Sequence, residues 1–154
     1  IHYFKSMRQI MTEQEERNKL IAEAKTWLRT PYIPEARVKG CGTDCGLFIL
    51  QSFENVGLLP HIDIPHYPFD IAANCATPMY LNKIKEYCTK TDSEPVPGDI
   101  IVYKFSGSKV PHHAAILYRN EYIIHSHVKT GVTLSNRKGF KKFEVGIYRF
   151  NKWL

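Results

Sequence analysis

The hydrophobic periodicity of the chain changes after about residue 90, and this change constrains the fold more than any other feature. In the first half, apolar residues recur three and four positions apart, which is helical spacing. Within residues 12–29 and 45–56 these positions are Leu20, Ile21, Ala24, Trp27 and Leu28, then Cys45, Phe48, Ile49, Phe53 and Val56. The second half carries short β-rich runs between turn residues. Helices followed by an antiparallel sheet predict an α+β fold.

Local signals predict where the first two helices begin. Thr12 and Glu15 form a capping box, in which each side chain accepts a hydrogen bond from the other residue's backbone N–H. Asp44 or Thr43 is suited to cap the second helix. Either cap places Cys45 in the first turn of that helix.

Turn residues divide the rest of the chain. Pro31 ends the first helix and Gly57 ends the second. Residues 35–44 are expected to form a polar loop, 60–72 an irregular connection and about 77–88 a third helix. The strands are expected at residues 100–105, 112–118, 122–128, 131–135 and 144–150. The second and third of these predict a hairpin with a three-residue loop, in which Tyr118 lies opposite Tyr122.

The length and charge of the chain exclude several classes of protein. A chain of 154 residues is expected to form one domain, here 12–154 after a flexible extension at 1–11. No apolar run reaches the roughly 18 residues of a membrane span, and the first 20 residues lack the apolar core of a secretory signal. The net charge of +6 comes from scattered lysines, without the pattern typical of nucleic-acid binding. We expect a monomer with no cofactor and no metal.

Cysteines occupy positions 41, 45, 75 and 88. Cys75 and Cys88 are expected to pack as small buried hydrophobes, and a chain of this length needs no disulfides. Cys45 has two interpretations, as core filler at the start of an apolar helix or as a thiol presented to a substrate. A helix N-terminus favours the second, because its free N–H groups and dipole lower the pKa of a thiol and can stabilise an oxyanion.

Four of the seven histidines, at positions 112, 113, 125 and 127, lie in the predicted hairpin. Because side chains alternate between the faces of a strand, His112 points away from His113. Pairing around the loop places His113 opposite His127 and diagonal to His125, on one face. One histidine is then available as a base for a cysteine and another to orient that base. The same cluster could instead bind zinc, although no ligand motif of short spacing is present.

Four segments of the chain together carry a family resemblance. They are TPYIP, GTDCGLFILQSF, PVPGDIIVY and HAAILYRNEYIIHSH, and they extend over roughly residues 20–150. Their order and spacing resemble the NlpC/P60 family of bacterial cell-wall cysteine peptidases, most closely its phage-tail-associated branch. The resemblance implies a minimal papain-like fold, in which a helix carrying the cysteine packs against an antiparallel sheet carrying the histidines.

The resemblance also implies roles for individual residues. Cys45 matches the nucleophile of the family and His113 its general base. His125 matches the polar residue that orients the base. Tyr32 matches a tyrosine near the substrate, and Asp44 the acid that precedes the nucleophile, so both are expected at the substrate site.

The chain departs from the family pattern directly after the nucleophile. The family usually reads D-C-S-G, whereas this chain has Gly46 and Leu47 after Cys45. Leucine takes the place of a close-packing glycine, which alters how the helix approaches the sheet and the shape of the pocket. His112, next to the expected base, is also unusual and could compete for its role.

These observations predict a cysteine peptidase or amidase that hydrolyses peptidoglycan stem peptides through a thioester. The resemblance implies the bond between γ-D-glutamate and a diamino acid. Three alternatives stay open: a non-catalytic module that binds wall or phage-tail partners, a zinc protein, and an acyltransferase that passes the thioester to an amine. Without a secretory signal, the protein is expected to be made in the cytoplasm and carried to the cell wall by a virion, a secretion system or lysis.

Overall fold

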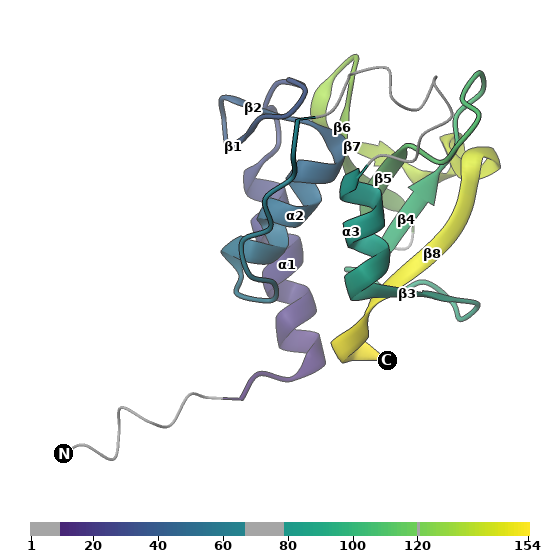
Figure 1. The fold of residues 1–154 in the computed structure, drawn as a ribbon. Helices are drawn as coiled ribbons and strands as arrows, with labels where there is room; N and C mark the ends of the chain where they lie inside the picture. The colour runs from purple at the N-terminus through teal and green to yellow at the C-terminus, as the bar shows by residue number, and fades with distance from the viewer. Residues whose placement is uncertain (1–9, 67–78, 120) are drawn as a thin grey trace.

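Helices and sheet form separate layers in the computed structural model, which describes residues 10–66, 79–119 and 121–154. In these ranges three helices, α1 (Glu13–Thr26), α2 (Cys45–Asn55) and α3 (Met79–Tyr87), lie to one side of a six-stranded antiparallel sheet (Figure 1). The strand order is β3–β8–β4–β5–β6–β7. The strands are β3 (Cys88–Thr91), β4 (Ile100–Tyr103), β5 (His113–Arg119), β6 (Tyr122–His127), β7 (Gly131–Asn136) and β8 (Glu144–Phe150). The predicted α+β fold is confirmed.

The first two helices begin at the predicted caps. The side chain of Thr12 accepts a hydrogen bond from the backbone N–H of Glu15 at 3.1 Å. Asp44, rather than Thr43, caps α2, because its Oδ1 accepts from the N–H of Leu47 at 2.9 Å. Each cap satisfies an N–H group that has no partner within the helix.

The helix ends follow the backbone dihedrals. Helix α1 stops at Thr26, three residues before the predicted end, and Arg29 takes a φ of +75°, outside the helical region. Helix α2 stops at Asn55, and Gly57 follows with a φ of +77°, as its sequence position predicts.

The sheet buries different side chains on its two faces. The helix-facing core includes sheet residues Ile100, Val102, Ala114, Ile116 and Ile124. The opposite face packs Ile101, Tyr103, Ala115, Leu117 and Ile123 against Phe105, Phe140, Phe143 and Ile147. Since side chains alternate along a strand, His113 stands with the second set rather than beneath the helices.

A buried ion cluster ties α1 to the sheet before β4. Asp99, which is fully buried, lies 2.9 Å from the Nη1 of Arg17 and 2.9 Å from the Nη2 of Arg149. Its Oδ2 also accepts a hydrogen bond from the N–H of Val96 at 2.8 Å. The aspartate of the PGD turn therefore has a structural role, at the end of β4 opposite to His113.

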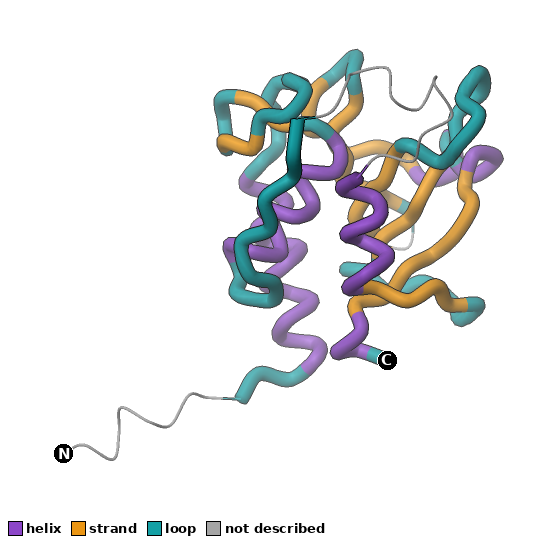
Figure 2. The backbone as a smooth tube through the Cα atoms, in the orientation of Figure 1, coloured by secondary structure: helices purple, strands orange, loops and turns teal. Residues whose placement is uncertain are grey.

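Two segments form strands that the sequence did not predict (Figure 2). Residues 88–91 form β3, which pairs with β8 at the edge of the sheet. The Thr and Lys residues of β3 are polar, which is common in an edge strand. The segment therefore shows no alternation of apolar residues from which a strand could be predicted. Within the predicted loop at 35–44, β1 (Arg37–Val38) pairs with β2 (Gly42–Thr43).

The hairpin of β5 and β6 keeps most of its predicted register. Ile116 pairs with Ile124 as predicted. Next to the loop the prediction is wrong, because Arg119 rather than Tyr118 pairs with Tyr122 and the register shifts between 117 and 119. A bulge of this kind adds one residue to one strand without changing the pairing farther away.

Some predictions fall outside the described residues. Cys75 lies there, as do residues 1–9 of the predicted extension, 67–72 of the predicted connection and 77–78 of the predicted third helix. Cys88 is buried, as predicted, with 6% of its surface exposed.

Candidate active site

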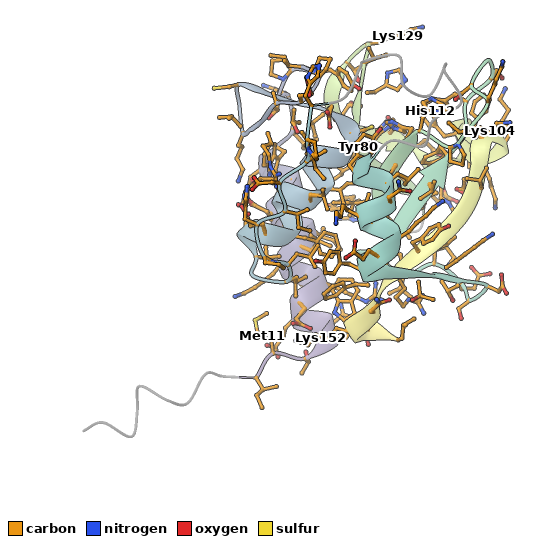
Figure 3. All side chains as sticks on the ribbon, viewed as in Figure 1. Met11, Tyr80, Lys104, His112, Lys129 and Lys152 are labelled. Carbon is orange, nitrogen blue, oxygen red and sulfur yellow. The ribbon has the colours of Figure 1, made fainter. Side chains whose placement is uncertain are left out.

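Cys45 is the first residue of α2 and lies where this helix meets β5. Its Sγ is 3.1 Å from the hydroxyl of Tyr80 and 3.7 Å from the carbonyl oxygen of His112. The backbone N–H of Ala114 also faces the sulfur. Figure 3 shows Tyr80 and His112 at the same end of the sheet. The thiol thus faces backbone groups of the residues directly before and directly after His113.

Burial raises the pKa of the Cys45 thiol to about 12, and the carboxylate of Asp44 adds to this effect. The hydrogen bonds that the thiol makes with Tyr80 and with the Ala114 backbone lower the pKa, but they do not offset the burial. The predicted lowering of the thiol pKa at the helix N-terminus is therefore wrong for this arrangement. The thiol is protonated at neutral pH while only 3% of the residue is exposed.

Three side chains on neighbouring strands form a hydrogen-bonded chain. The Nε2 of His113 lies 2.8 Å from the Nδ1 of His125, and the Nε2 of His125 lies 2.9 Å from the Oγ of Ser135. His125 pairs with Thr133 across β6 and β7, so Ser135, two residues on, lies on the same face. In the described part of the chain, the Nδ1 of His113 makes no hydrogen bond. That nitrogen is therefore available for a further hydrogen bond.

Ser135 was missed in the sequence. The alternation of side chains along the GVTLS strand could have indicated this residue. It places the Ser135 hydroxyl on the same side as His125 once the β6–β7 register is known. The sequence alone did not fix that register.

Burial favours the neutral form of both histidines. The pKa of His113 is held well below its usual range by burial and by the neighbouring His125, His127 and His112. Burial, followed by His127, lowers the pKa of His125 to about 4. A neutral imidazole can accept a proton on one nitrogen while the other nitrogen donates, so His113 is in the form that a general base requires.

The other two hairpin histidines have different partners. The Nδ1 of His127 accepts a hydrogen bond from the N–H of Lys129 at 3.2 Å. The Nδ1 of His112 donates to the carbonyl of Val110 at 3.2 Å. His113 therefore bonds to His125, whereas His127 only packs near it, with ring centroids 6.1 Å apart.

Tyr32 and Asp44 border the thiol. Burial raises the pKa of Tyr32 far above its usual value, and the nearby Cys45 and Asp44 raise it further. Both oxygens of Asp44 accept backbone hydrogen bonds at 2.9 Å, Oδ1 from Leu47 and Oδ2 from Glu35. Asp44 therefore holds together the start of α2 and the segment that follows Tyr32.

The thiol and the predicted base are neighbours that do not engage each other. Among the described residues, no hydrogen bond joins Cys45 to His113. The ring of His113 packs instead against Tyr103 and Phe105, with centroid distances of 5.8 and 5.0 Å. Cys45 belongs to the helix-facing core. The Cys45 thiol and the His113 ring therefore have separate sets of contacts in this structure.

The described ranges contain neither a cluster of metal ligands nor a membrane-spanning helix. No three histidine, cysteine or carboxylate side chains there converge to hold a metal ion. The hairpin histidines bond to each other, to a serine and to backbone groups. None of the helices described is long and apolar enough to cross a membrane.

Comparisons with known proteins define the family of this fold and site. The model of the NlpC/P60 family matches residues 29–149, which is most of the chain. The chain therefore belongs to the NlpC/P60 family. No curated protein matches it.

Solved structures of NlpC/P60 proteins share the fold at low sequence identity. An NlpC/P60 family protein from Bacillus cereus matches with a TM-score of 0.62 and 24% identity, covering 87% of this chain and 40% of that protein. The NlpC/P60 domain of the peptidoglycan hydrolase SagA matches with a TM-score of 0.61 and 18% identity, covering 85% of this chain and 96% of that domain. NlpC1 from Trichomonas vaginalis matches with a TM-score of 0.62 and 17% identity, covering 92% of this chain and 46% of that protein. The chain thus spans less than half of two of these proteins.

Proposed function

We propose that the protein hydrolyses an amide bond in peptidoglycan stem peptides, with Cys45 as nucleophile, His113 as general base and His125 as the residue that orients the base. The observation that carries this proposal is the hydrogen bond between His113 Nε2 and His125 Nδ1, at 2.8 Å, beside a helix-tip cysteine. When Nε2 of His113 donates in that bond, its Nδ1 is unprotonated and can accept the proton of the thiol. Membership of the NlpC/P60 family and likeness to a named peptidoglycan hydrolase support the substrate class.

The proposed reaction has two stages. The Nδ1 of His113 takes the thiol proton, and the sulfur of Cys45 bonds to the amide carbon while the N–H groups at the start of α2 stabilise the oxyanion. His113 then gives its proton to the leaving amine as the C–N bond breaks, which leaves a thioester. Water attacks the thioester, again losing a proton to His113, and the products are a carboxylic acid and the free thiol.

Tyr32 and Asp44 are proposed to shape the substrate site. The phenol of Tyr32 lies close enough to Cys45 and Asp44 for their charges to affect its pKa. Asp44 acts by holding the segment after Tyr32 through the N–H of Glu35. A substrate would then contact the phenol directly and the carboxylate indirectly.

The finer parts of the proposal come from the family resemblance. They are cleavage between γ-D-glutamate and a diamino acid, a place in the phage-tail branch with tail proteins as partners, and action of a monomeric domain at the cell wall. The KGCGTDC approach to Cys45 supports the branch.

One observation favours a second function, a wall-binding module without catalysis. The Cys45 thiol is buried, and its pKa is raised to about 12, so it is not activated in this arrangement. Catalysis requires a rearrangement that exposes it, whereas a binding module requires none.

Mass spectrometry of peptidoglycan digests separates the two functions and reports the bond cut. We expect the wild-type protein and Cys41→Ala, which removes an exposed cysteine, to release the same stem-peptide fragments. Cys45→Ala should release none. Equal digestion by Cys45→Ala would refute the nucleophile, and binding to peptidoglycan without digestion by any of the three would favour the module.

A further inference from the structure

The side chain of Tyr80, near the N-terminus of α3, closes over the start of α2. Its hydroxyl lies 3.1 Å from the Sγ of Cys45 and donates a hydrogen bond to the carbonyl of His112 at 2.7 Å. Only 5% of Tyr80 and 3% of Cys45 are exposed. The phenol therefore shields the sulfur from solvent.

Gly46 makes room for this ring. A Cβ atom at position 46 would lie 1.9 Å from Cδ2 and 2.0 Å from Cγ of Tyr80, far inside van der Waals contact. Gly46 lies in α2 and is not among the glycines with positive φ, so its backbone conformation does not require glycine. The serine that is usual in the family at this position does not fit while the ring of Tyr80 stays. Gly46 and Tyr80 are therefore a matched pair.

The position of the ring conflicts with acyl transfer. A scissile carbonyl carbon must bond to the Sγ of Cys45, and its oxygen must reach N–H groups in the first turn of α2. The ring of Tyr80 fills the space beside Gly46 in that turn, and its hydroxyl occupies one side of the sulfur. The substrate and the ring cannot occupy this place together.

We propose that Tyr80 is a displaceable cap on the nucleophile, and that the acyl segment of a peptide substrate moves it away from Gly46 before Cys45 reacts. The cap keeps the thiol inaccessible in the absence of substrate. The proposal rests on the proposed role of Cys45 as the nucleophile.

Three substitutions distinguish the contribution of the Tyr80 ring from that of its hydroxyl. Tyr80→Ala removes the cap. Gly46→Ser leaves Tyr80 in the chain but forces its ring out of the observed position. Tyr80→Phe keeps the ring and removes the hydroxyl, which bonds to Cys45 and to the His112 carbonyl.

The test is the rate at which iodoacetamide alkylates Cys45, followed by peptide mapping at one fixed pH without substrate. Two other cysteines serve as internal references, since Cys41 is exposed and Cys88 is buried elsewhere. In the wild type we expect Cys45 to react much more slowly than Cys41. Tyr80→Ala and Gly46→Ser should each raise the Cys45 rate about tenfold or more, because a closed state that dominates the population suppresses the rate by that population ratio. Tyr80→Phe should raise it less, and the Cys88 rate should not change.

Two results would overturn the cap. One is a wild-type Cys45 that reacts as fast as Cys41. The other is a Cys45 rate that does not rise in Tyr80→Ala, or that rises only in step with Cys88, since a parallel rise reports general loosening. Alkylation requires no hydrolysis, so the cap can hold in a protein that fails to digest peptidoglycan. The two proposals therefore fail separately.

Discussion

The two ends of strand β4 both carry buried polar groups, yet they differ in how completely those groups are paired. Before the strand, both oxygens of Asp99 are bonded to arginine side chains or to a backbone N–H. At the other end, His113 uses one ring nitrogen on His125, and the second makes no hydrogen bond among the described residues. Complete pairing marks a structural cluster, whereas a buried ring nitrogen without a hydrogen bond marks a place where chemistry can occur.

The largest expected effect is a loss of activity at the end of β4 where His113 lies. His113→Asn removes the proposed base, and we expect hydrolysis of peptidoglycan peptides to fall about 10³-fold or more, as for general bases that activate a nucleophile. Initial rates measured by liquid chromatography give the comparison. The matched control is His127→Asn, which removes a neighbouring ring without a bond to His113 and should retain most activity. Equal losses in both variants would contradict the assignment of the base.

Removing the carboxylate of the Asp99 cluster should lower the stability of the fold instead. Asp99→Ala leaves Arg17, which is 2% exposed, without its buried carboxylate. We expect the free energy of unfolding to fall by about 3–5 kcal/mol, measured by urea denaturation. Lys39→Ala, which breaks the more exposed pair with Glu23, should cost less than about 1 kcal/mol. A small effect of Asp99→Ala would show that this end is not a structural cluster.

Acid should destabilise the histidine end. The pKa of His125 falls from 6.5 to about 4 on burial, so the unfolded chain binds the extra proton at the higher pH. The stability that depends on the neutral ring is present above about pH 6.5 and is lost as the pH falls towards 4, at a cost of about 3 kcal/mol for this group. His113, whose pKa is also lowered, acts in the same direction. Urea denaturation at several pH values measures this slope, and His125→Asn should flatten it; an unchanged slope would argue against the buried neutral pair.

The smallest effect is expected at the end of the hydrogen-bonded chain. Ser135→Ala removes the partner of His125 Nε2 without touching His113. One lost hydrogen bond of about 1 kcal/mol predicts a roughly fivefold lower kcat with little change in KM. Ser135→Thr keeps the hydroxyl and should restore most of the rate. A loss as large as that of His113→Asn would mean that Ser135 contacts the substrate.

Much of this architecture follows from local sequence. The apolar spacing and the cap at Asp44 place Cys45 at a helix tip, and strand alternation places His113 beside His125. These features depend on neighbours in the chain or on one hairpin register, which a short loop limits to few choices.

The features that the sequence did not predict depend on distant packing. Tyr80 reaches Cys45 from α3, 35 positions away, and the state of the thiol depends on that contact. A helix N-terminus alone predicts a lowered pKa for the Cys45 thiol, whereas burial of the thiol raises it. Gly46 departs from the family pattern in the sequence, and the position of the Tyr80 ring explains this departure.

We propose above all that Cys45 forms a covalent acyl intermediate. Intact-protein mass spectrometry after acid quenching of a reaction with a purified stem peptide tests it most directly. We expect a mass increase equal to the acyl part of the peptide, mapped to Cys45 and absent in Cys45→Ala. Cleaved peptide with no adduct, together with full activity of Cys45→Ala, would contradict it.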